Sequence, residues 1–302
     1  MNQKITPCLW FDGNAKEAVD YYLSLFPDSK ILDTSYYPKS TEEGLGDFQK
    51  DLAGEVLTIN FELSGYRFTA LNAGSEFKLN QSISFMVNFD KLRDKQAMSK
   101  IDELWAGLLD GGKVIMPLDK YPYSERYGWV KDRYGVTWQL IVIEPEDKTI
   151  NFIMPSLMFS GENANHTEEA INFYTSVFKD AKLGMLARYE EDRGPARAGS
   201  LMYADFTLSK QWFAAMDSGA DGTPNFNEAI SLVVTCKDQA EIDYFWDKLS
   251  SVPEAEQCGW CKDKFGLSWQ IIPESLGDLM SNPGAFAKLM EMKKLVIAEF
   301  SA

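Results

Sequence analysis

One stretch of this chain occurs twice. Residues 127–141 read YGWVKDRYGVTWQLI, and residues 258–272 read CGWCKDKFGLSWQII. The glycine, aspartate, tryptophan and glutamine positions coincide, each pair 131 residues apart. Such self-similarity indicates a duplicated structural unit. A chain of 302 residues is also long enough for two domains of about 150 residues each.

The duplication extends upstream. The short apolar stretch at 5–11, expected to be a strand, returns at 153–159. Helical apolar spacing at 17–26 (EAVDYYLSLF) returns at 169–178 (EAINFYTSVF). Strand, helix and three further strands therefore recur as one pattern, twice in each repeat.

A strand expected at 113–118 has no counterpart in the second copy. We therefore predict a first unit over 1–145 and a second unit over 150–273, with one strand short or missing. A C-terminal helix is predicted over 274–302.

Composition limits the partners. Hydrophobic residues make up 45% of the chain, enough for a buried core. The net charge of −15 argues against nucleic acid and anionic membrane surfaces, because both attract basic patches. The N-terminal residues lack a signal-peptide pattern, and four cysteines are few. We expect a cytoplasmic protein with no nucleic-acid or membrane partner.

Two motifs carry a family resemblance. The segment 13–22 reads Gly-Asn-Ala-x-Glu-Ala-x-x-Tyr-Tyr, and 132–139 reads Asp-x-x-Gly-Val-x-Trp-Gln. The chain resembles the vicinal oxygen chelate superfamily of glyoxalase, bleomycin-resistance and dioxygenase relatives. Within it, the chain is most similar to the PhnB-like, 3-demethylubiquinone-9 3-methyltransferase-like branch.

This resemblance implies an α+β fold of βαβββ modules. It implies two tandem units, each a curved, mostly antiparallel sheet with flanking helices that encloses a cavity. Single-unit relatives commonly pair. Here we expect either a monomer with an internal pseudo-dimer or a homodimer.

Many of these relatives bind a divalent metal. The family's ligand positions fall on Thr6, Ser82 and Gln139 in the first unit, and on Met154, Ala229 and Gln270 in the second, with Asn72 and Asp217 near the remaining position. A first-row metal needs several imidazoles or carboxylates. The one histidine, His166, is expected at the start of a helix. We therefore predict no metal and no cofactor.

The paired glutamines are the strongest candidates for ligand contact. On a strand, Gln139 faces away from Trp138, toward the cavity, and Ser84 and Ser231 are expected near the same space. An amide both donates and accepts, which suits a neutral polar ligand. A buried amide that satisfies neighbouring backbone groups is an equal alternative. The ligand-binding candidates are Thr6, Trp10, Asn72, Ser82, Ser84, Gln139, Asp217, Ser231 and Gln270.

The remaining motifs have structural interpretations. The aspartates of Asp132-x-x-Gly135 and of 263–266 are expected to cap turns. Cys258 and Cys261 lie at i and i+3 on a strand, facing opposite ways, so a redox pair is not expected. No glycine-rich turn follows a strand, which leaves the methyltransferase description without support from the sequence.

Three functions remain open. The leading interpretation is a metal-independent small-molecule-binding protein. The alternatives are a lyase, isomerase or transferase acting on a small polar or aromatic substrate, and a structural scaffold without a ligand. Because Thr6 and Ser82 are replaced by Met154 and Ala229, the second unit is expected to be the more structural one.

Overall fold

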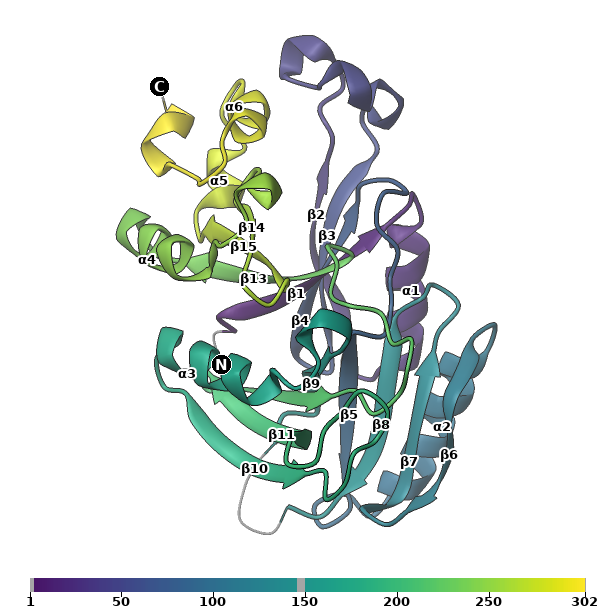
Figure 1. Ribbon diagram of the computed structural model, residues 1–302. Coiled ribbons are helices and arrows are strands. Elements are labelled where there is room, and N and C mark those ends of the chain that lie inside the picture. The colour runs from purple at the N-terminus through teal and green to yellow at the C-terminus, as the bar shows by residue number, and fades with distance from the viewer. Residues whose placement is uncertain (1–2, 146–149, 302) are drawn as a thin grey trace.

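The computed structural model describes residues 3–145 and 150–301 (Figure 1). Its strands form two curved sheets. Sheet A has the order β14 (Trp260–Lys262), β15 (Ser268–Pro273), β13 (Ile230–Cys236), β1 (Ile5–Phe11), β4 (Tyr66–Asn72), β3 (Val56–Leu63) and β2 (Lys30–Tyr36). Sheet B has the order β10 (Lys182–Arg188), β11 (Leu201–Leu208), β12 (Gln211–Asp217), β9 (Ile153–Phe159), β5 (Ile83–Asp90), β8 (Thr137–Ile143), β7 (Ser124–Lys131) and β6 (Lys113–Tyr121).

Each sheet combines half of one repeat with half of the other. In sheet A, β1 pairs antiparallel with β13, so that Cys8 lies opposite Ser231. In sheet B, β5 pairs antiparallel with β9, so that Ser84 lies opposite Ser156. The predicted α+β fold of βαβββ modules is confirmed, but each repeat contributes to both sheets instead of forming its own. The first strand of each module has a free edge, and the first strand of a module from the other repeat covers it.

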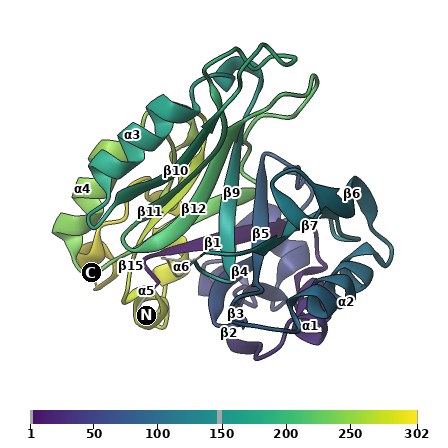
Figure 2. The same ribbon diagram turned by 90° about the horizontal axis from the view of Figure 1, so that it is seen from below.

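The four long helices cover one face of each sheet, two helices to a sheet. They are α1 (Ala15–Leu25), α2 (Ala97–Leu109), α3 (Thr167–Val177) and α4 (Gln239–Leu249). Figure 2 shows α1 and α2 along one side and α3 and α4 along the other. Their apolar faces pack on β3 and β4, β7 and β8, β11 and β12, and β13 and β15 respectively. Burial of this apolar surface is the main stabilising contribution, and it leaves the opposite face of each sheet for other contacts.

The repeated hairpin contains a buried carboxylate. Oδ1 of Asp132 accepts hydrogen bonds from the backbone N–H groups of Tyr134 and Val136, so it caps the turn. Its Oδ2 accepts from the Tyr22 hydroxyl and the Trp138 indole, both at 2.8 Å. Asp263 accepts the equivalent four bonds in the second repeat, from Phe265, Leu267, Tyr174 and Trp269. The turn cap is therefore also part of the core.

The second repeat lacks a full counterpart of β6 among its described residues. A 3₁₀ turn, η4 (Pro253–Ala255), precedes the three-residue strand β14 in that region. Three other 3₁₀ turns lie in loops: η1 (Thr41–Glu43), η2 (Asp47–Leu52) and η3 (Gly161–Asn163).

The C-terminal segment is not the single helix that the sequence predicted. It forms α5 (Leu276–Leu279), α6 (Ala285–Glu291) and η5 (Ile297–Ser301). Pro283 cannot donate a backbone hydrogen bond, and Gly284 has φ of +75°, so a continuous helix is interrupted there. Phe286 of α6 packs with Tyr37 and Leu45, which ties this segment to the far side of sheet A.

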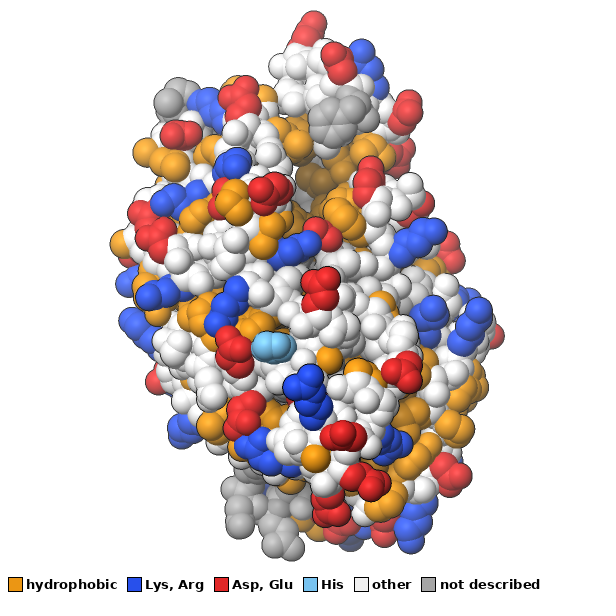
Figure 3. Space-filling view, in the orientation of Figure 1, with side chains coloured by type: hydrophobic (Ala, Val, Ile, Leu, Met, Phe, Trp, Pro, Cys, Tyr) orange, Lys and Arg blue, Asp and Glu red, His pale blue; other side chains and the backbone are white. Residues whose placement is uncertain are grey.

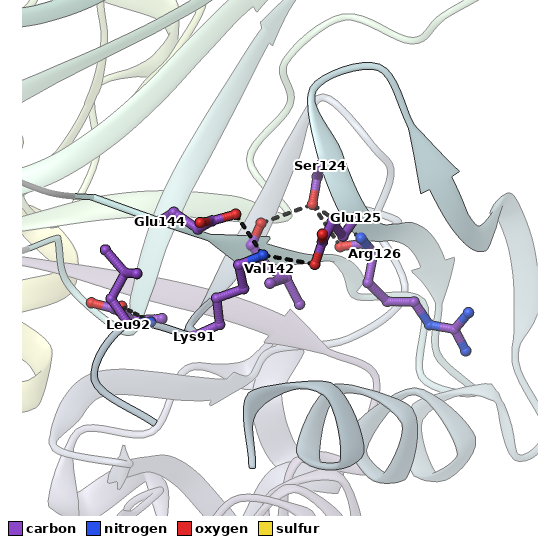
Figure 4. A network of polar contacts seen from close by, with 8 residues as sticks. Lys91, Leu92, Ser124, Glu125, Arg126, Val142 and Glu144 are labelled. Carbon is purple, nitrogen blue, oxygen red and sulfur yellow. Dashed lines mark hydrogen bonds and ion pairs between the residues drawn. The ribbon is translucent and has the colours of Figure 1, made fainter. Parts of the chain in front are cut away.

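Ion pairs fix one end of sheet B (Figure 4). Lys91, just after β5, lies 2.7 Å from Glu125 of β7 and 2.6 Å from Glu144 beyond β8. The Ser124 hydroxyl donates to the carbonyl oxygen of Val142 at 2.8 Å. These contacts join three neighbouring strands at their ends.

Candidate functional site

Both sheets carry a glutamine on the face opposite the helices. Strand alternation separates Gln139 from the buried Trp138, and Gln270 from the buried Trp269. The two sites are equivalent by the repeat, since Ser84 corresponds to Ser231. Their surroundings differ, and the difference decides which one can accept a ligand.

Both the nitrogen and the oxygen of the Gln139 amide in sheet B have hydrogen-bond partners. Its Nε2 donates to the hydroxyls of Ser84 at 2.7 Å and Ser156 at 3.3 Å. Its Oε1 accepts from the Tyr127 hydroxyl at 2.8 Å. Gln139 is only 1% exposed. It therefore matches the buried-amide alternative, although its partners are side chains and not backbone groups.

Apolar side chains fill this face of sheet B. Met86, Met154 and Ala214 form a buried cluster. Four partly buried side chains pack against it, namely Ile141, Ile150, Tyr203 and Trp212. The cluster sits beside the Gln139 site, so that face is closed.

Only the nitrogen of the Gln270 amide in sheet A has a hydrogen-bond partner among the described residues. Its Nε2 donates to the Ser231 hydroxyl at 2.8 Å. Its Oε1 accepts no hydrogen bond from the part of the chain that the structure describes. The repeat explains this, because the position of Tyr127 is taken by Cys258. Gln270 is also half-exposed, so its oxygen is available to a donor from outside.

The Cys8 thiol lies beside the Gln270 amide and the Ser231 hydroxyl, and we call these three groups the polar centre. Cys8 lies opposite Ser231 in the β1–β13 pair, where sheet B has Ser156. Burial raises the pKa of Cys8 to about 11, against the lowering effect of the neighbouring Gln270 and Ser231 side chains. The group is therefore a neutral thiol at physiological pH. The sequence pattern did not mark Cys8 as a site residue, although the offset that aligns the two repeats also aligns Cys8 with Ser156.

Smaller side chains keep this face of sheet A open. Thr6 and Val233 lie opposite each other where sheet B has Met154 and Met86. Thr69 pairs with Cys8 where sheet B has Ala214. No methionine cluster fills this face among the described residues. Figure 3 shows the surface hollowed between the C-terminal helices and the η1–η2 segment, with hydrophobic side chains in the hollow.

Aromatic side chains border the polar centre. The ring of Trp10 lies 4.9 Å from that of Phe77 and 6.1 Å from that of Trp260, edge to face in both cases. The Trp10 indole N–H donates to the carbonyl oxygen of Gly74 at 2.7 Å, which fixes its orientation. All three rings are half-exposed. We call the surface formed by Thr6, Cys8, Trp10, Ser231, Trp260 and Gln270 the open face.

Five predicted site residues lie elsewhere. Asn72 accepts from the Ala15 N–H at 3.0 Å, and Asp217 accepts from the Thr167 N–H and hydroxyl, so both hold the first turn of a helix. Burial raises the pKa of Asp217, and these hydrogen bonds lower it. Ser82 is buried beside the start of β5. Ser84 lies with Gln139 on the closed face. Of the predicted set, the structure brings together Thr6, Trp10, Ser231 and Gln270.

The residues do not fit a first-row metal. Because the sheets mix the repeats, the family's ligand positions regroup as Thr6, Ala229 and Gln270 in sheet A, and as Met154, Ser82 and Gln139 in sheet B. Neither set contains an imidazole or a carboxylate, the ligands that such ions prefer. Within the described ranges, no three His, Cys, Asp or Glu side chains converge. His166 precedes α3, exposed beside Glu169.

Cys258 and Cys261 are both free. Cys261 is buried in the core, and burial raises the pKa of both thiols. Neither has the lowered pKa that reactive thiolates need.

No helix in the described part of the chain is both long and apolar enough to cross a membrane.

Comparison with known proteins gives one family and one fold. A family model described as 3-demethylubiquinone-9 3-methyltransferase matches residues 3–141 and again 151–272. A putative 3-demethylubiquinone-9 3-methyltransferase, PhnB protein, from Bacillus cereus is 33% identical over 47% of this chain and 100% of that chain, with a TM-score of 0.39. Glyoxalase I from Zea mays is 12% identical over 88% of this chain and 92% of that chain, with a TM-score of 0.50, which shows the shared fold. No curated protein matches the chain.

Proposed function

The chain belongs to the 3-demethylubiquinone-9 3-methyltransferase family, a PhnB-like branch of the vicinal oxygen chelate superfamily, and we propose that it binds a small, neutral, hydroxylated aromatic molecule on its open face. One observation carries the proposal. Oε1 of Gln270 has no donor among the described residues, whereas the same atom of Gln139 is bound by Tyr127.

The surroundings of Gln270 favour this ligand class. A hydroxyl group of the ligand donates to Gln270 Oε1, since an amide oxygen is an acceptor. Its ring packs against Trp10 and Trp260, which offer half-exposed aromatic surface. None of the six side chains that define the open face is charged, which favours a neutral molecule. The family description names a demethylubiquinone, whose ring carries a hydroxyl group.

The same residues favour binding over catalysis. The polar groups of the open face are an amide, two hydroxyls and the Cys8 thiol. Burial holds the pKa of that thiol at about 11, so it is neither a ready nucleophile nor a base at neutral pH. General acid–base catalysis needs a positioned group that moves a proton. We also propose that the protein acts in the cytoplasm as a monomer, its two repeats forming an internal pseudo-dimer.

The test is a binding screen with matched variants. Isothermal titration calorimetry measures the affinity of the protein for catechol, hydroquinone and 2-naphthol. Analogues that lack the hydroxyl group, such as naphthalene, serve as the comparison. Gln270→Ala is expected to weaken hydroxylated ligands about tenfold, the cost of one buried hydrogen bond. Gln139→Ala, the equivalent change on the closed face, is expected to lower stability and leave affinity unchanged.

Two outcomes oppose the proposal. If no hydroxylated aromatic molecule binds the wild-type protein, the result favours the interpretation of a structural scaffold without a ligand. If turnover of a bound molecule is detected by mass spectrometry, and Cys8→Ala abolishes it, the enzyme interpretation replaces simple binding.

A further inference from the structure

Three tyrosines surround the end of the Gln139 side chain in sheet B. The Tyr127 ring lies 5.6 Å from that of Tyr121 and 5.4 Å from that of Tyr123, edge to face in both cases. These rings, which we call the tyrosine cluster, come from the end of β6, the turn that follows it and β7. Tyr127 is 6% exposed, and its hydroxyl donates to Oε1 of Gln139 at 2.8 Å. In sheet B the protein therefore fills this position with a phenol of its own.

The second repeat lacks all three rings. The 131-residue offset puts Val252, Glu254 and Cys258 at the positions of the tyrosine cluster, and none of these three residues lies in a strand. Pairing of β7 with β8 begins at Tyr127, whereas pairing of β14 with β15 begins at Trp260. Cys258 has φ of +52°, so the chain there bends away from the path that β7 follows. The short β14 and the missing tyrosines are thus one difference between the repeats.

This difference uncovers an equivalent pair of side chains. Trp129 lies opposite Gln139 in sheet B, and Trp260 lies opposite Gln270 in sheet A. The first pair is buried, with 7% of Trp129 and 1% of Gln139 exposed. Trp260 and Gln270 are both half-exposed, and Oε1 of Gln270 is accessible and has no donor among the described residues. The place that the Tyr127 ring fills in sheet B is therefore open to a ligand in sheet A.

The C-terminal segment borders this place. The N–H group of Cys258 donates to the carbonyl oxygen of Met292 at 2.7 Å. Sγ of Cys258 lies 3.7 Å from Sδ of Met290. Met290 is half-exposed and packs against the apolar cluster that includes Tyr37 and Phe286. A ligand group that extends in this direction contacts apolar side chains.

A tyrosine side chain is a phenol substituted at position 4, opposite the hydroxyl. We propose that a 4-substituted phenol occupies the corresponding place on sheet A. Its hydroxyl donates to Oε1 of Gln270, its ring packs against Trp260, and its apolar substituent extends toward Met290. This inference rests on the proposed function and narrows it, from hydroxylated aromatic molecules in general to phenols with an apolar group at position 4.

The first experiment compares ligands on the wild-type protein by isothermal titration calorimetry. The probes are p-cresol, its isomer o-cresol, whose methyl group lies beside the hydroxyl, and 4-methylanisole, whose oxygen has no proton to donate. We expect p-cresol to bind about tenfold more tightly than 4-methylanisole and severalfold more tightly than o-cresol. In Gln270→Ala the difference between p-cresol and 4-methylanisole is expected to disappear, because the acceptor is gone.

Two variants locate the substituent and the ring. 4-Propylphenol is expected to bind more tightly than p-cresol, by about fourfold for each CH₂ group that is buried. This gain should shrink in Met290→Ala and persist in Met185→Ala, which removes an exposed methionine from β10. Tyr127→Ala leaves Oε1 of Gln139 without its donor. That variant is expected to bind a second p-cresol, which raises its melting temperature.

The outcomes separate this inference from the function on which it rests. If o-cresol binds as tightly as p-cresol and both require Gln270, the open face still binds phenols, but the inference is overturned. If neither cresol binds at millimolar concentration, the proposed function fails as well. A folded Tyr127→Ala that binds only one p-cresol also overturns the inference, since sheet B then offers no model for the site. If Tyr127→Ala does not fold, the comparison of ligands on the wild-type protein decides.

Discussion

The hydroxyl of Tyr22 donates a 2.8 Å hydrogen bond to the carboxylate of Asp132, and this bond connects the two sheets. Tyr22 belongs to α1, which packs on sheet A, whereas Asp132 belongs to the β7–β8 hairpin of sheet B. Tyr174 and Asp263 repeat the bond at 2.8 Å in the second half of the chain. Each repeat is therefore held together through its helix layer, while its strands are shared between the sheets.

Replacing either aspartate with asparagine is expected to destabilise the protein. An asparagine side chain has one acceptor oxygen, so part of the set of four donors loses its partner inside the core. We expect Asp132→Asn and Asp263→Asn each to lower the free energy of unfolding by about 2 kcal/mol, as measured by urea denaturation. Asp20→Asn, at an exposed ion pair with Lys16, is the control and should cost less than about 0.5 kcal/mol. Equal effects at all three positions would contradict this account.

The same aspartates predict a pH dependence. Burial raises the pKa of Asp132 and of Asp263 to about 6, from an ordinary 3.8, although their hydrogen bonds lower it. Between these values the folded protein binds more protons than the unfolded chain. The stabilising effect of protonation is thus complete below pH 3.8 and is lost as the pH rises toward 6.

The stability of the wild type relative to the double variant Asp132→Asn/Asp263→Asn should therefore fall between pH 4 and pH 6, because the wild type loses this contribution over that range and the variant does not. Exposed carboxylates such as Glu168 and Glu169, whose pKa values ion pairs lower, are common to both proteins and cancel in the comparison. Parallel stability curves across pH 4–7 would show that the two carboxyls do not titrate in this range.

Filling the open face should abolish ligand binding. Thr6→Met with Val233→Met copies the methionine pair that closes sheet B. We expect hydroxylated aromatics to lose measurable affinity, because the added side chains occupy the space beside Gln270. The reverse change, Met154→Thr with Met86→Val, is expected to cost more than about 2 kcal/mol of stability by leaving a cavity. Retained binding in the filled variant would place the ligand elsewhere.

A fragment of residues 1–145, the first repeat, is expected to form a dimer. Alone, it exposes the edges of β1 and β5, which β13 and β9 cover in the full chain. In two copies, β1 of one fragment can pair with β5 of the other, because the modules correspond. Sedimentation should give twice the fragment mass at micromolar concentration. A stable monomeric fragment would show that each repeat closes its own edges.

Much of the fold could be predicted because the repeat preserves local patterns. The Gln139–Gln270 correspondence and the turn-capping role of Asp132 follow from adjacent residues. The exchange of strands between repeats could not be predicted, since the β1–β13 pairing leaves no local signal. Asn72, which the resemblance places near a ligand position, bonds to the start of α1, and this contact between strand and helix leaves no local signal in the sequence. The break of the C-terminal helix had a visible cause in Pro283 and Gly284.

The shared sheets also constrain biosynthesis. Cys8 on β1 must wait for Ser231 before that pair forms, so 222 residues lie between the two partners on the growing chain. Until β13 leaves the ribosome, the first strand to be made has an uncovered edge. Contacts this distant in sequence slow folding and prolong the exposure of such edges. The duplication thus secures both halves of the assembly in one molecule, at the cost of a nascent chain that stays vulnerable to aggregation until translation is nearly complete.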